Sequence, residues 1–222
     1  ILYKKENNNW IMHSKIIPPH WLLTSWNDVD SFSNYITIYK NLLIIITNKL
    51  IHSGNNHKGS IAYIYTRHTE LFPNYWIRTG EIKSDSDTSF FNSASIHEYY
   101  GVLGDSENNK IYIIKNNISN FTIKTKHYNY WTITHTITNS NLKGFGYNVS
   151  IINNELAVNY LKETQLLNEN KIIMEGGVCY YKKNFMNESW NKIENVSSIG
   201  NKFHNAHIIN GDFSIFGDNN NV

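Results

Sequence analysis

The stretch Gly144-Phe145-Gly146-Tyr147-Asn148-Val149-Ser150-Ile151-Ile152-Asn153-Asn154-Glu155-Leu156-Ala157-Val158 predicts two short β-strands joined by a tight turn. Val149 and Ile151 alternate with polar neighbours, which is the pattern of a half-buried strand. Asn153 and Asn154 both tolerate positive φ, so they suit a two-residue hairpin turn. The alternation resumes after the turn, and the whole stretch is therefore a predicted β-hairpin.

Similar hairpins occur three more times in the chain, and each begins with phenylalanine. They span Phe32 to Ile46, Phe90 to Gly104 and Phe203 to Gly217. The second and fourth hairpins also share a Gly-Asp ending, at Gly104-Asp105 and Gly217-Asp218. The chain therefore contains an internal repeat, which is the first feature to establish in a sequence of this kind.

Two further strands are predicted after each of the first three hairpins. The third strands are 59–65, 110–115 and 177–181, and the fourth strands begin at Trp76, Trp131 and Trp190. The tryptophans are 55 and 59 positions apart. Four strands in about 50 residues are typical of a propeller blade, whereas a solenoid has a shorter period. We therefore predict an all-β fold, a β-propeller of four-stranded antiparallel blades, with the three tryptophans packed between blades.

The repeat divides a single predicted domain, residues 1–222, into units of about 32–89, 90–144 and 145–202. A fourth unit is split between 203–222 and 1–12, because residues 2–4 and 10–12 resemble a third and a fourth strand. Two alternatives follow. The termini could pair and close a ring of four blades, which removes exposed sheet edges, or the chain could be a piece of a larger propeller.

The motifs resemble those of a known family. Gly59-Ser60-Ile61-Ala62-Tyr63-Ile64-Tyr65, Trp76 and the Phe145-Gly146 hairpin are similar to the FG-GAP repeats of integrin-α-like propellers. Only the third unit carries Phe-Gly itself, and the Gly-Ala-Pro ending of the family is absent. The resemblance implies a protein-interaction, adhesion or structural assembly module, at the cell surface or outside the cell. The single Cys179 leaves an intracellular setting open.

Composition and charge limit the classes of partner that we expect. The formal net charge is +2 and 17% of residues are charged, so nucleic acid is not indicated as a partner. No apolar run approaches the roughly 20 residues of a membrane span. The 35 asparagines, with abundant Ile, Lys and Tyr, are typical of AT-rich, protist-like coding sequences. Five glycosylation sequons are what this composition gives by chance, so they carry no information about secretion.

Because of the FG-GAP resemblance, calcium is the cofactor to be considered. Calcium requires about 6–8 oxygen ligands, which several residues of one loop supply. The predicted turns between first and second strands are too short and do not supply enough carboxylates, since Glu98 is the single one among them. The acidic loops Asp85-Ser86-Asp87 and Asp105-Ser106-Glu107-Asn108-Asn109 remain, with Asp105, Glu107 and Asn109 as candidate ligands. Polar turns explain these loops equally well, and we expect no cofactor.

Enzymatic activity is not predicted. Arg67 and Arg78 are the only arginines, so the arginine cluster of a sialidase-like propeller is absent. A glycosidase needs two facing carboxylates, and nothing in the sequence pairs any two. His204 and His207 are three apart, so a strand would place them on opposite faces. A glycosidase-type propeller stays as an alternative to a non-catalytic module.

Four aromatic residues lie in connectors, outside the repeated positions. They are Trp21, Trp26, Tyr128 and Tyr130. Connectors carry function on rigid scaffolds, and exposed aromatic side chains are common in binding surfaces. We therefore name these four as candidate partner-binding residues. We expect the partners to be other proteins, either individually or within a larger assembly. The alternative function is that of a carbohydrate-binding lectin.

Overall fold

The computed structural model describes residues 1–16, 29–50, 59–68, 75–86, 88–117, 130–166, 171–197, 209–210 and 213–214. All regular secondary structure in these ranges is β, and the described residues include no helix. The predicted all-β fold is confirmed. Among these residues there is accordingly no helix that is long and apolar enough to cross a membrane.

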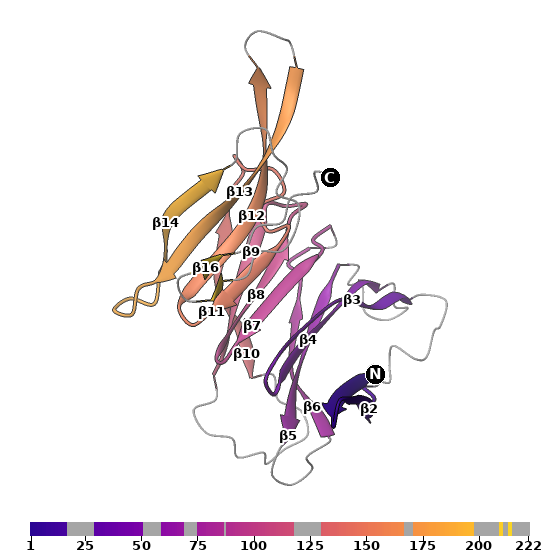
Figure 1. Ribbon diagram of the computed structural model, residues 1–222. Coiled ribbons are helices and arrows are strands. Elements are labelled where there is room, and N and C mark those ends of the chain that lie inside the picture. Colours follow the sequence, from indigo (N-terminus) through magenta and orange to yellow (C-terminus); the bar gives the residue numbers. More distant parts are fainter. Residues whose placement is uncertain are drawn as a thin grey trace.

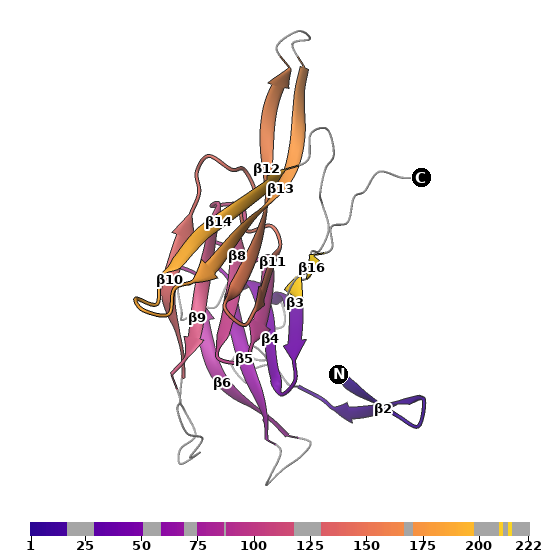
Figure 2. The same cartoon turned by 60° about the vertical axis from the view of Figure 1, so that its left-hand side comes forward.

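Three antiparallel sheets of four strands each make up most of the chain. The first sheet contains β3 (Val29–Tyr39), β4 (Leu42–Leu50), β5 (Ile61–His68) and β6 (Tyr75–Lys83). The second contains β7 (Ser93–His97), β8 (Tyr100–Asp105), β9 (Lys110–Asn116) and β10 (Trp131–Thr138). The third contains β11 (Val149–Ile152), β12 (Glu155–Leu166), β13 (Lys171–Lys183) and β14 (Trp190–Ser197). The sheets are stacked in sequence order (Figures 1 and 2), so each predicted unit is one sheet.

The register of the third and fourth strands repeats from sheet to sheet. In each sheet a tryptophan is the first or second residue of the fourth strand and pairs with the third strand: Trp76 pairs with Arg67, Trp131 with Asn116 and Trp190 with Lys183. A β-bulge then falls three residues after each tryptophan, at Thr79, Thr134 and Ile193. The spacing read from the sequence therefore marks a structural repeat.

The N-terminal hairpin has this register too. It consists of β1 (Leu2–Glu6) and β2 (Asn9–Ser14), as predicted. Trp10 pairs with Lys5, and the register shifts at His13, again three residues after the tryptophan. The β1–β2 hairpin therefore corresponds to the third and fourth strands of a repeat unit.

Two of the three tryptophans pack between sheets, as predicted. Trp131 is fully buried in the cluster between the first and second sheets, together with Phe91 and Ile64. Trp190 lies in the cluster between the second and third sheets with Phe145. Trp76 is partly buried on the other face of the first sheet.

Hydrogen bonds reinforce the contact between the second and third sheets. The hydroxyl of Ser93 donates to the carbonyl of Gly146 at 2.8 Å, and the Ile151 amide donates to the hydroxyl of Ser95 at 3.1 Å. The first strands of neighbouring sheets are in contact, β7 with both β3 and β11. The sheets therefore meet along their first strands.

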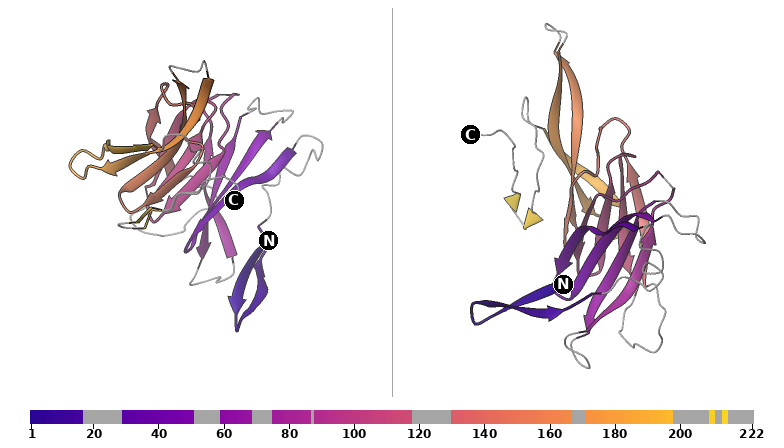
Figure 3. Two further views of the ribbon diagram at one scale, coloured as in Figure 1. Left: turned by 45° about the horizontal axis from the view of Figure 1, so that its top comes forward. Right: turned by 90° about the vertical axis from the view of Figure 1, so that its right-hand side faces the viewer.

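The described strands from the two ends of the chain do not pair with each other. β15 (Ile209–Asn210) and β16 (Phe213–Ser214) form a separate two-stranded sheet, in which β15 contacts β11 and β12. The β1–β2 hairpin projects from the stack (Figure 3), and none of the described strands joins these two hairpins. The closure through the termini, one of the two alternatives drawn from the sequence, is therefore not observed in the described part of the chain.

A long two-stranded arm extends from the third sheet. β12 pairs with β13 from Glu155↔Lys182 to Leu166↔Lys171, whereas β11 pairs only with the first four residues of β12. The ribbon therefore runs well past its neighbouring strands, as Figure 1 shows. The predicted third strand 177–181 is only the part of β13 that lies within the sheet.

Candidate functional site

The stack has two ends with different structures, which we call the turn end and the loop end. At the turn end, two-residue turns join the first and second strands of each sheet, and the β13–β14 loop lies beside them. At the loop end, connectors lead from one sheet to the next, and the β12–β13 arm projects from it (Figure 1). Each end is a candidate site.

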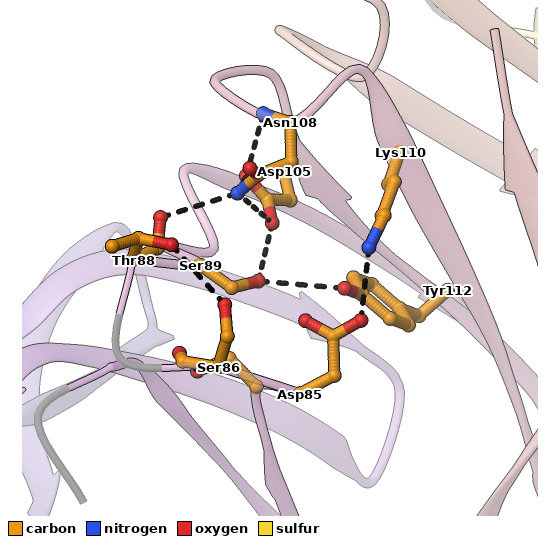
Figure 4. Close-up of polar contacts among 9 residues, drawn as sticks. Asp85, Ser86, Thr88, Ser89, Asp105, Asn108, Lys110 and Tyr112 are labelled. Carbon is orange, nitrogen blue, oxygen red and sulfur yellow. Dashed lines mark hydrogen bonds and ion pairs between the residues drawn. The ribbon is translucent and has the colours of Figure 1, made fainter.

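The loop end brings together the two acidic loops singled out in the sequence (Figure 4). Asp105, the last residue of β8, is fully buried. Its carboxylate accepts a short hydrogen bond from the hydroxyl of Ser89. The side-chain amide of Asn108 lies 3.1 and 3.0 Å from the two carboxylate oxygens of Asp105, and the Asn108 backbone amide donates at 3.2 Å. Asp105 thus holds its own turn and the preceding connector.

Asp85 extends this network to β9. Its carboxylate lies 3.0 Å from Nζ of Lys110, and the hydroxyls of Ser89 and Tyr112 are 3.4 Å apart. Burial tends to raise the pKa of Asp85, but hydrogen bonds from Lys110 and Tyr112 outweigh it and lower the pKa. Burial raises the pKa of Tyr112 to about 12. The network fastens the connector that follows the first sheet to the second sheet.

The three calcium candidates have different partners in this structure. The Asp105 carboxylate accepts from Ser89 and Asn108, whereas the Asn109 side-chain oxygen accepts from the Phe145 amide at 3.3 Å. Glu107 is exposed. Among the residues that the structure describes, no three His, Cys, Asp or Glu side chains are grouped so that they could hold a metal. The absence of a cofactor stays a prediction, and the geometry assigns Asp105 and Asn109 to contacts between strands and sheets.

At the turn end, the three hairpin turns have the same form. They join Tyr39 to Leu42, His97 to Tyr100 and Ile152 to Glu155. The first turn residue has positive φ each time, 50° at Lys40, 51° at Glu98 and 54° at Asn153. Asparagine adopts this conformation readily, whereas Lys and Glu do so less often. The repeat therefore keeps its turn geometry when the residue changes.

His97 connects the three turns. Its ring lies 4.2 Å from the ring of Tyr39 in the first sheet, measured between centroids. Its Nδ1 accepts a hydrogen bond from the Asn153 amide of the third sheet at 3.3 Å. Lys40 and Glu98 form an ion pair of 3.9 Å between the first two turns. The three turns therefore lie side by side.

A cationic cluster lies next to these turns. Nζ of Lys115 is 2.9 Å from the carboxylate of Glu188, and Nζ of Lys183 is 3.5 Å from it. Lys183 is buried, donates to the hydroxyl of Tyr100 and lies 4.6 Å from the centre of that ring. A hydrogen bond from Lys115 lowers the pKa of Glu188. These contacts fix the β13–β14 loop against the second sheet.

Three large apolar side chains in the β7–β8 turn and the β13–β14 loop, close in sequence to Tyr100 and Lys183 of this cluster, are open to solvent. Tyr99 is 61% exposed, Phe185 71% and Met186 98%. Tyr99 stands in the β7–β8 turn, and the other two stand in the β13–β14 loop. None of the three was predicted from the sequence as a binding residue. The signal that could have revealed Phe185 and Met186 is their position as an apolar pair between Asn184 and Asn187, inside a polar turn.

Of the four aromatic residues named from the sequence, only Tyr130 can be placed. Trp21, Trp26 and Tyr128 lie outside the described residues. Tyr130 is partly buried against the cluster between the first and second sheets. Its backbone amide donates to Thr79 and its carbonyl accepts from Asn117, both at 2.9 Å. Tyr130 thus packs at the seam of two sheets.

Comparisons with known proteins found no relative of this chain. No family model, no curated protein and no solved structure matches the chain.

Proposed function

We propose that the chain is a non-catalytic propeller-type interaction module, similar to FG-GAP repeat proteins, whose turn end binds another protein. The repeated register of the tryptophan-marked strands supports the propeller part of this proposal. So does the stacking of the sheets along their first strands β3, β7 and β11. Blades arranged in this way form a rigid scaffold that presents turns at its two ends.

The observation that carries the proposal is the group of exposed apolar side chains at the turn end. Tyr99, Phe185 and Met186 are exposed and stand in two loops at this one end, whereas other exposed apolar side chains, such as Ile36 and Ile193, lie within strands. Tyr, Phe and Met are enriched at protein interfaces, and clustered exposed apolar side chains mark interaction sites.

The residues next to these exposed side chains are held in place by several contacts. Lys183 and Lys115 both hold Glu188, and the Lys183 amide donates to the carbonyl of Asn154 at 2.8 Å. A surface that is fixed before binding loses less conformational entropy when a partner docks. The turn end therefore combines exposed anchors with a preorganised base.

The loop end fits a structural role better. Its buried carboxylate, that of Asp105, is fully engaged by Ser89 and Asn108. Its outer carboxylate, that of Asp85, faces Lys110. Both groups act within the chain in this arrangement, which favours a scaffold over a catalytic pair.

Affinity capture tests the proposal. The wild-type chain is immobilised and exposed to a lysate of its source cells, beside the triple variant Tyr99→Ser/Phe185→Ser/Met186→Ser. Tyr147→Ser is the matched control, because Tyr147 is 47% exposed but lies at the loop end. We expect the wild type and Tyr147→Ser to retain the same protein and the triple variant to lose it.

Retention of that protein by all three forms would contradict binding at the turn end. A glycan array run in parallel separates the lectin alternative. Glycan binding that the triple variant loses would assign the turn end to carbohydrate instead of protein.

A further inference from the structure

The side chain of His97 contacts both neighbouring turns. It is 8% exposed, at the end of β7. On one side its ring packs on Tyr39, and on the other its Nδ1 receives the amide proton of Asn153. A single imidazole thus couples the first sheet to the third through the second.

The hydrogen bond fixes the protonation state of the ring. Nδ1 can accept the Asn153 amide proton only while that nitrogen is unprotonated, because an imidazolium carries a proton on both nitrogens. When His97 is protonated, two N–H groups face each other in a largely buried place. The contact between the second and third turns is then lost.

We propose that His97 is an acid-sensitive latch, which holds the three hairpin turns together when neutral and releases the third turn when protonated. The consequence for partner binding rests on the proposed function, since the latch would then control the geometry of the turn-end surface. The latch itself is a property of the free chain.

The charges around the ring oppose one another. Glu98 on the same turn favours the protonated form, whereas Lys40 on the neighbouring turn disfavours it. On the third sheet, the carboxylate of Glu155 is held by Lys182 at 3.3 Å. The ring of Tyr39 would also attract an imidazolium. Burial is the largest influence, and it lowers the pKa of His97 below its ordinary value of 6.5.

The direction of the pH effect follows from linkage. The folded chain binds this proton less readily than the unfolded chain does, so the stabilisation from neutral His97 is complete above the unfolded value. That stabilisation is lost as the pH falls from about 6.5 through the lower, folded pKa.

NMR on the free chain of residues 1–222 tests the latch. The imidazole shifts of His97 and the hydrogen-exchange protection of the Asn153 amide are followed from about pH 7.5 to 5, after correction for intrinsic exchange. We expect the amide to lose protection with the same midpoint as the His97 titration. Constant protection through that titration would overturn the proposal.

Two variants separate the hydrogen bond from the ring. His97→Asn supplies an oxygen near the position of Nδ1 and does not titrate, so its Asn153 amide should stay protected at every pH. His97→Leu fills the space without an acceptor, so this amide should lose protection even at neutral pH. Loss of protection in His97→Asn on acidification, parallel to the wild type, would overturn the proposal. Should His97→Leu fail to fold, the wild type and His97→Asn still decide.

A separate experiment tests whether the protonation of His97 controls partner binding. The protein captured at pH 7.5 should dissociate from the wild type at low pH and remain on His97→Asn. If the latch titrates as expected but the captured protein never depends on the turn end, the proposed function fails and the latch stands. If the partner binds at the turn end but its release is the same for both forms, the regulatory link fails alone.

Discussion

Trp131 and Trp10 occupy equivalent positions in two hairpins but have opposite environments. Each is the first or second residue of its strand, each pairs with the preceding strand, and each is followed by a bulge three residues later. Trp131 is fully buried between two sheets, whereas Trp10 is 69% exposed on the β1–β2 hairpin. The hairpin itself therefore sets the register, and a neighbouring sheet sets the burial.

This difference separates two sources of order in the chain. Hairpin geometry is local, because it depends on turn residues and alternation. Stability comes mainly from apolar area removed from water, which requires a second sheet. The three stacked sheets should therefore hold most of the free energy of unfolding, and β1–β2 should hold little of it.

Truncation of the two tryptophans gives the largest expected contrast. Trp131→Ala leaves a cavity between the first and second sheets, so we expect a loss of about 3–5 kcal/mol in the free energy of unfolding. Trp10→Ala should change it by no more than about 0.5 kcal/mol. Urea denaturation of both variants measures the contrast, and equal losses would show that burial does not distinguish the two positions.

A smaller effect is expected at the close contact between the second and third sheets. A Cβ atom on Gly104 would lie 2.0 Å from the carbonyl oxygen of Gly146 and 2.3 Å from Oγ of Ser93. Backbone cannot yield as a side chain can, so Gly104→Ala should cost about 1–3 kcal/mol.

Gly101→Ala is the matched control for this substitution. Its Cβ would meet the Ile114 side chain at 3.0 Å, and that side chain can move aside. Gly101 is on the same strand, β8. Thermal unfolding of both variants tests the contact, and a greater loss in Gly101→Ala would contradict the sheet spacing described here.

The smallest effect concerns an ion pair at the loop end, outside the buried interfaces. The pKa of Asp85 is lowered in the folded chain, although burial alone would raise it, because Lys110 and Tyr112 donate to the carboxylate. Its contribution is therefore present above the unfolded pKa and disappears as the pH falls through the folded value.

Asp85→Asn measures that contribution. The carboxylate is 46% exposed, so solvent screening limits the cost at neutral pH to about 1 kcal/mol or less. The stability difference between wild type and Asp85→Asn should shrink on acidification to about pH 3, below the ordinary pKa of aspartate. A difference that grows on acidification would contradict the assigned sign.

The sequence contained most of the fold because the repeat is local in character. Trp76, Trp131 and Trp190 marked the fourth strands, and the turns at Asn153 and Glu98 fell where alternation stopped. The long arm was missed, since residues 161–166 and 171–176 continue the strands beyond the sheet without any change of composition that marks its edge. Ring closure depends on contacts between distant segments, which alternation does not encode.

The candidate site was harder to predict for a physical reason. Asp105 and Asp85 were recognisable as acidic loop residues, but whether a carboxylate meets a metal or a serine depends on tertiary contacts. Phe185 and Met186 are apolar residues that a composition argument assigns to a core. Only the arrangement of the strands shows that they face solvent.

Native-state hydrogen exchange, resolved by residue, tests the central claim most directly. We expect the slowest exchange in the inner strands of all three sheets, in segments about 55 to 59 residues apart, and fast exchange throughout β1–β2. Protection that lacks this repeat, or that is as strong in β1–β2 as in β4, β8 and β12, would contradict an account in which stacked, repeated sheets hold the chain together.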